Sequence, residues 1–293
     1  MKRSVLLAGL AAFAVAMPSH GGEGLFSRVY TVETVPQGHF EVEQLVRDRE
    51  GRAFGSYNSI DLKTELEYGI TDKFQLALYL NTGHISAHNS PDDDDPQGAT
   101  GFTRNASYLQ SIAAEFIYRI YNPVSDGIGL AFYLEPEYDF TDLHNGLPYD
   151  TTFENEARML VQKNFLDDRL IIAYNLILEG EFIRFKGDDQ WAGELDFNNE
   201  IGVSYRFASN WYGGLEARNH NELGDFHNHE HSVYWAGPAL HYGGQKAWAT
   251  LGVLRQVYGR PSGTADNGSY IGDDLFLRSH EKWETTFKIG IPF

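Results

Sequence analysis

The sequence predicts an all-β chain that closes into a transmembrane, antiparallel, up-and-down barrel of about 12 strands. Three observations predict it: apolar and charged residues alternate, short and long connections alternate, and the chain begins with an export signal. The chain has 293 residues, a formal net charge of −18 and no cysteine. The acidic balance argues against nucleic acid as a partner, because phosphate binding needs a basic surface. Beyond the export signal, no apolar run reaches the roughly 18 residues of a membrane helix.

Residues 1–16 have the three regions of a secretory signal peptide. Lys2-Arg3 is the basic start, an apolar stretch follows, and a small-x-small cleavage site ends at Ala16. We expect cleavage after this residue, with a boundary as late as about residue 22 as the alternative. Residues 17–293 then form a single barrel domain in the outer membrane of a Gram-negative bacterium. The absence of cysteine fits a chain that crosses an oxidising periplasm without relying on disulfides.

Alternation with a period of two defines the first hairpin. Apolar and charged residues alternate from Ile60 to Ile70, and a helix would scatter those charges around its circumference. Thr71-Asp72-Lys73 reads as a tight turn, and the alternation resumes from Phe74 to Leu80. The same unit recurs, which predicts further strands near Phe40–Val46, 112–120, 128–138, 157–161, 170–178, 195–207, 211–217, 232–242, 247–258 and 283–293.

Connections between these strands alternate in length. Short turns are predicted near 71–73, 122–127, 166–168, 208–210 and 243–246, and longer polar connections near 48–56, 82–106, 141–152, 185–193, 219–231 and 259–276. Short periplasmic turns and long outer loops are typical of outer-membrane barrels. Aromatic residues near the strand ends predict two interfacial girdles, with Trp211 on the periplasmic side and Tyr57 on the outer side. A secreted β-sandwich is the structural alternative, but its outer face would be only mildly polar.

Two resemblances support the barrel. Residues 286–293 alternate and end on Phe293, and they resemble the C-terminal signal of bacterial outer-membrane proteins. That resemblance implies recognition by the barrel-assembly machinery. The segments Tyr30-Thr31, 36–44 and 64–72 resemble an uncharacterised, porin-like family of proteobacterial outer-membrane β-barrels. This second resemblance spans nearly all of the mature chain, and it implies fold and location without an activity.

If the apolar residues face lipid, the alternate residues of each strand face the lumen. The predicted lumen-lining residues are Asp61, Lys63, Glu65, Glu67, Glu115, Arg119, Glu135, Glu137, Glu154, Glu156, Arg158, Glu179, Glu200, Arg206, Glu216 and Arg218. Arginine–carboxylate pairs are expected to brace the wall. Over all inward positions the sequence predicts about eighteen carboxylates and about eight bases. This surplus of about ten carboxylates would attract cations, as acidic rings do in cation-preferring pores. The bracing role and the conducting role are compatible.

Two outer connections carry possible metal ligands. Asp92–Asp95 lie between two prolines, where a solvated loop is the plain interpretation and divalent-ion binding the sharper one. In the other connection, Asp225, His227, His229 and His231 form the candidate metal site. Alternate histidines on an extended segment share one face and can converge on zinc, copper or nickel. A surface loop that is merely rich in histidine is the alternative, and no other cofactor is predicted.

Catalytic motifs are weak. Asp225-x-His227 is similar to the Asp/His pair of omptin proteases, but the companion acidic pair would have to come from another loop. The chain has no phosphate-binding glycine loop, no nucleophile elbow and no outward-facing Ser-His-Asn arrangement. We therefore do not expect an enzyme.

The sequence thus predicts a porin-like channel or transporter, surrounded by outer-membrane lipid, that passes small polar or cationic solutes through an acidic lumen. The alternative is a non-conducting barrel whose His- and Asp-rich outer loops bind metal ions or another surface component. The two differ in whether the lumen is open.

Overall fold

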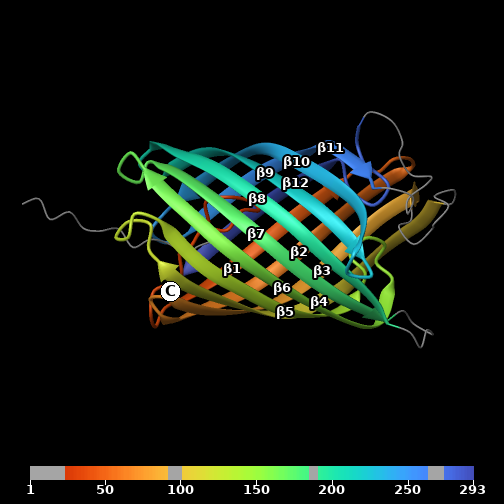
Figure 1. Cartoon of the computed structure of the whole chain (residues 1–293), viewed down its shortest axis with the longest axis horizontal. Coiled ribbons are helices and arrows are strands. Elements are labelled where there is room, and N and C mark those ends of the chain that lie inside the picture. Colours follow the sequence, from red (N-terminus) through yellow and green to blue (C-terminus); the bar gives the residue numbers. More distant parts are fainter. Residues whose placement is uncertain (1–23, 92–100, 185–190, 263–273) are drawn as a thin grey trace, which may run out of the picture.

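A computed structural model describes residues 24–91, 101–184, 191–262 and 274–293. Twelve antiparallel strands form a closed barrel in which the last strand pairs with the first (Figure 1). The strands are β1 (Phe40–Glu50), β2 (Ser56–Thr71), β3 (Phe74–Pro91), β4 (Gly101–Tyr121), β5 (Gly129–Thr141), β6 (Pro148–Phe165), β7 (Leu170–Arg184), β8 (Ala192–Ala208), β9 (Trp211–Gly224), β10 (Asn228–Gly243), β11 (Trp248–Pro261) and β12 (Trp283–Pro292). The predicted fold and strand number are confirmed. The predicted signal peptide and Asp92–Asp95 lie outside the described residues.

The outer face of the barrel is apolar over its middle section. Leu78, Phe132 and Leu215 are 57%, 51% and 67% exposed, and their neighbours along each strand point inward. Soluble proteins rarely expose a continuous apolar surface of this extent, whereas a lipid-facing wall requires one. The protein is therefore an outer-membrane barrel. No helix among the described residues is long and apolar enough to cross a bilayer.

The strands run further on the outer side than the alternation predicts. β3 and β4 extend through most of the predicted connection 82–106, and β9 and β10 leave only residues 225–227 between them. The prediction of loops at 82–106 and 219–231 was wrong. Beyond the membrane, polar side chains can point to either side of a strand while its backbone remains paired, so the apolar–polar alternation ends before the strand does. Tyr57 is also corrected: it is 3% exposed and faces the lumen, where its hydroxyl donates to the carbonyl of His144 at 3.2 Å. The five short turns lie where they were predicted.

Pairing of β1 with β12 forms the seam that closes the barrel. The C-terminus lies at the end of the barrel that carries the short turns (Figure 1). The amide of Phe40 donates to the carbonyl of Phe293 at 3.0 Å, and the amide of Phe293 donates back at 2.9 Å. The two rings stack with their centroids 5.7 Å apart. The terminal phenylalanine therefore pairs with the first strand at the seam.

Residues 24–38, called the belt below, lie inside the periplasmic half of the barrel. Side chains of four strands of the wall accept the belt's backbone amides. The acceptors are Glu216 on β9 for Ser27 (2.8 Å), Asn175 on β7 for Tyr30 (2.7 Å), Gln162 on β6 for Val32 (3.0 Å) and Gln75 on β3 for Val35 (2.8 Å). An extended segment has no sheet partner for these amides, and buried amides require one. Inward-facing amide and carboxylate side chains therefore supply the hydrogen-bond acceptors that a neighbouring strand would otherwise provide.

Small residues on the wall leave room for the belt. A Cβ at Gly202 would lie 2.5 Å from the Phe26 ring, and a Cβ at Gly129 would lie 2.6 Å from a methyl group of Val32. Contacts that short require something to shift. Glycine at these positions lets the belt pack directly on the strand backbone.

On the outer side, two further segments fold into the lumen. The carbonyl of Leu143 accepts from Arg49 at 2.9 Å, which holds residues 142–147 inside the rim. Residues 274–282, which precede β12, enter from the opposite wall of the barrel. The side chain of Gln256 accepts the amide of Phe276 at 2.6 Å. Trp235 donates from its indole nitrogen to the carbonyl of Glu281 at 3.1 Å. The described structure thus narrows the lumen at both ends.

Candidate functional site in the lumen

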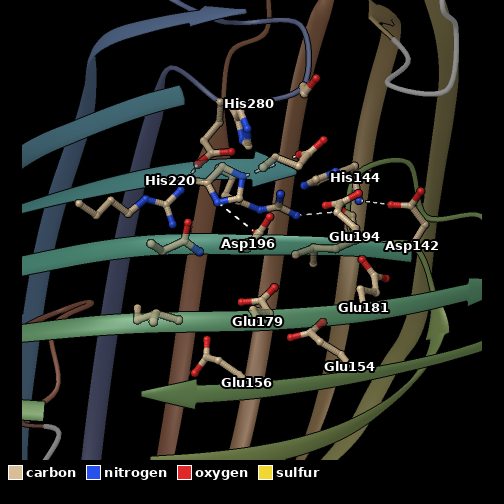
Figure 2. A pocket seen from close by; sticks show the side chains of 18 of the residues that line it. Asp142, His144, Glu154, Glu156, Glu179, Glu181, Glu194, Asp196, His220 and His280 are labelled. Atoms are coloured by element: carbon tan, nitrogen blue, oxygen red, sulfur yellow. Dashed lines mark hydrogen bonds and ion pairs between the residues drawn. The ribbon is translucent and has the colours of Figure 1, made fainter. Parts of the chain in front are cut away.

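A cavity of about 610 Å³ lies between the belt and the two inward-folded outer segments. Its lining includes Arg28 from the belt, His144 from residues 142–147 and His280 from residues 274–282. Among the described residues, thirteen carboxyl groups and six arginines border it, so acidic side chains outnumber arginines on its wall. Figure 2 shows many of these carboxylates reaching into the cavity from adjacent strands.

The structure places the sixteen predicted lumen residues on the same strand faces as the buried side chains. Eight are buried, namely Asp61, Glu65, Glu67, Glu115, Glu137, Glu156, Glu200 and Glu216, and eight are half-buried, namely Lys63, Arg119, Glu135, Glu154, Arg158, Glu179, Arg206 and Arg218. Six of the sixteen line the cavity: Glu154, Glu156, Arg158, Glu179, Glu200 and Arg218. The others lie elsewhere along the inner wall. Glu216, for example, holds the belt.

The carboxylates of β5 to β9 form two rows, called the acidic rows below. Strand register places them directly opposite one another: Glu137, Glu154, Glu181 and Glu194 form the first row, and Glu135, Glu156, Glu179, Asp196 and Glu222 form the second. Like charges directly opposite in a sheet repel one another. Among the described residues, no ion pair joins Glu154, Glu179 or Glu181 to a basic side chain. This wall therefore presents closely spaced carboxyl groups to the cavity (Figure 2).

Arginines gather on the other side of the cavity around Glu284 of β12. Arg28, Arg47 and Arg218 approach this carboxylate at 3.7, 3.8 and 3.7 Å. Arg28 also lies 3.7 Å from Glu200. Paired charges of this kind brace a wall, as the sequence predicts. Arg158 pairs with Glu156 of the second acidic row. The arginines around Glu284 face that carboxylate and Glu200, and none of them pairs with Glu154, Glu179 or Glu181 among the described residues.

The candidate metal residues separate in the structure. Asp225, His227 and His229 are exposed at the β9–β10 turn, whereas His231 is 2% exposed and faces the lumen. The expected shared face is lost because the pairing register shifts between His229 and His231. The structure does not bring the first three together with the fourth.

His231 instead joins a second set of side chains: His220 and Glu222 of β9, and His280 of the inward segment 274–282. Burial and the neighbouring imidazole of His231 hold the pKa of His280 well below its usual 6.5. His220, Glu222 and His280 were not among the predicted metal ligands, although His220 and Glu222 lie in the His-rich connection 219–231. His280 lies in a connection without periodicity, and only the inward folding of that connection places it here.

Residues 18–293 match a family described as a family of unknown function (DUF6662). The chain belongs to this family. That membership confirms the resemblance to an uncharacterised family, and no curated protein matches the sequence.

The chain is similar to several solved structures. The COG4313 outer membrane channel from Pseudomonas putida F1 is 11% identical, with a TM-score of 0.57 over 89% of this chain and 98% of that chain. The NanC porin is 10% identical, with a TM-score of 0.47 over 87% and 98% of the two chains. LpxR from Salmonella typhimurium is 9% identical, with a TM-score of 0.47 over 86% and 99%. At these identities, the likeness to the first structure shows the fold and nothing finer.

Proposed function

We propose that this barrel is a porin-like channel for small polar solutes that favours cations. The observation that carries the proposal is the pair of acidic rows facing the cavity. Rings and rows of carboxylates in narrow pores raise the local concentration of cations and repel anions. The low-permittivity wall of a barrel focuses this field into the lumen.

The size of the effect follows from Coulomb's law. Two carboxylates at about 6 Å from a passing monovalent cation contribute together about 1.4 kcal/mol at the permittivity of water. That free energy corresponds to about a tenfold change in local cation concentration, and salt reduces it. Neutralising one pair within the first acidic row is therefore expected to alter ion selectivity by a measurable factor.

The test is ion selectivity of the refolded protein in planar bilayers under a salt gradient. We expect the double variant Glu154→Gln/Glu181→Gln to lower the cation-to-anion permeability ratio by about threefold to tenfold, because the two residues are opposite each other in register. The matched control is Asp167→Asn/Asp168→Asn, which removes two carboxylates from an exposed periplasmic turn. A ratio that falls equally in the control, or in neither variant, contradicts the proposed role of the acidic rows.

The alternative, a barrel that binds at its outer side without conducting, draws support from a different observation. The belt and the segments 142–147 and 274–282 occupy the lumen from both ends. A folded and inserted protein that gives no conductance steps would favour this alternative. Under the channel proposal, the belt instead limits the size of the solutes that pass.

A further inference from the structure

Three imidazoles and one carboxylate converge on the outer side of the lumen cavity. His220 and Glu222 come from β9, His231 from β10 and His280 from residues 274–282. One nitrogen or oxygen from each lies within 4.8 Å of all the others. All four residues border the cavity, so an ion can reach them from it.

The spacing suits a small ion with four ligands. Tetrahedral coordination with bonds of about 2.0–2.1 Å places ligand atoms about 3.3 Å apart. Nε2 of His231 lies 3.4 Å from Oε2 of Glu222, and Nε2 of His220 lies 3.8 Å from the same oxygen. Nε2 of His231 and Nε2 of His280 are 2.6 Å apart, so these two rings would separate by less than 1 Å to admit an ion.

The surrounding side chains orient the rings. Nδ1 of His220 lies 3.2 Å from Oδ2 of Asp196, which leaves Nε2 directed toward the cluster (Figure 2). That Nε2 is buried and has no hydrogen-bond partner among the described residues. A carboxylate on the far nitrogen of a histidine is the usual arrangement behind a metal ligand, because it fixes the tautomer and raises basicity.

Aromatic rings hold the other two histidines. The His231 ring stacks on Phe276 with centroids 4.6 Å apart, and the His280 ring meets Trp235 edge-on at 5.3 Å. These contacts limit ring rotation, so the donor atoms are positioned before an ion arrives. The cluster thus has both a ligand set and the supporting contacts that metal sites require.

We infer that His220, Glu222, His231 and His280 form a transition-metal site in the lumen, with Asp196 as the positioning residue for His220. Imidazole nitrogen with one carboxylate suits zinc, copper or nickel, whereas calcium and magnesium take oxygen ligands. The neighbouring carboxylates Glu194 and Asp196 add negative charge that attracts a divalent cation. The inference goes beyond the proposed channel function and requires no ion flow.

The experiment is titration of the refolded full-length protein in detergent with zinc, followed by calorimetry and by competition with a chromophoric chelator. We expect one zinc ion per chain. His280→Ala should weaken binding by at least tenfold, and Asp196→Asn should weaken it by about 10–100-fold. The matched control is His227→Ala, which removes an exposed histidine of the β9–β10 turn and should leave the affinity unchanged.

Two checks keep the result decisive. Circular dichroism confirms that each variant is folded, and Glu222→Gln replaces His280→Ala if that variant does not fold. Tetrahedral absorption of Co²⁺ in the wild type, lost in Glu222→Gln, would support the four assigned ligands. The inference is overturned if the wild type binds no zinc, or if only the turn variant loses it. Conductance is measured separately, so failure of the metal site leaves the channel proposal standing, and the converse also holds.

Discussion

Replacing Glu216 by glutamine should detach the belt from the wall. The carboxylate accepts the amides of Ser27 and Arg28 at 2.8 Å each, the Ser27 hydroxyl at 2.9 Å and the amide of Val29 at 3.4 Å. Hydrogen bonds to a charged acceptor contribute about 1.5–3 kcal/mol each. Glutamine keeps one acceptor oxygen and turns an NH₂ group toward the remaining donors, so we expect a net loss of about 3 kcal/mol of belt docking.

A loss of this size raises the detached population about 100-fold. The assay uses the absence of native cysteine: Val29→Cys, at a position 1% exposed, becomes the single thiol of the chain. The thiol reacts with a maleimide only when the belt is detached, because local opening controls access to a buried group. The labelling rate in Val29→Cys/Glu216→Gln should therefore exceed that in Val29→Cys by about 100-fold.

The control is Glu181→Gln on the same Val29→Cys background. Glu181 lies in the first acidic row, away from the belt, and its neutralisation should leave the labelling rate unchanged. A labelling rate in Val29→Cys/Glu216→Gln within about threefold of the rate in Val29→Cys would refute the proposed role of Glu216. It would mean that these four hydrogen bonds add almost nothing to the free energy of belt docking.

Two further predictions concern close packing and export. Gly202→Ala places a methyl group against the Phe26 ring and should lower the free energy of belt docking by about 1–3 kcal/mol. In the same thiol-labelling assay, the effect of Gly202→Ala should be smaller when Phe26 is already alanine. Equal effects with Phe26 and with alanine at this position would contradict the contact. Phe293→Ala should lower the amount of barrel in the outer membrane, whereas refolding of the purified protein into lipid should be unchanged because this side chain is 64% exposed and contributes one ring contact to the seam. Equal membrane levels of wild type and variant would argue against recognition of the terminal residue.

Alternation predicted the strands and the direction of their side chains because both depend only on local period. The position of Glu154 on an inward face follows from its neighbours in sequence. Its placement opposite Glu181 follows from the tight turn between β6 and β7, but the rows also depend on the β5–β6 and β7–β8 registers, which the longer outer connections do not fix. The acidic surplus was therefore predictable, and its arrangement in rows was not.

The belt and the histidine cluster depend on contacts between residues far apart in the chain. Gln75 and Asn175 stand inward on their strands as neutral polar residues, and each binds a belt amide. Such buried amides, together with Gly202 on the wall, are a usable signal that a chain segment lies in the lumen. His231 and His280 meet only because of a register shift in β10 and the inward folding of residues 274–282.

The most direct test of the account is the reversal potential of the wild-type protein in a planar bilayer with unequal potassium chloride on the two sides. The acidic rows predict stable conductance steps and a reversal potential displaced toward the equilibrium potential of potassium. A reversal potential displaced toward that of chloride, or a folded and inserted barrel that passes no current, would contradict the cation-favouring channel.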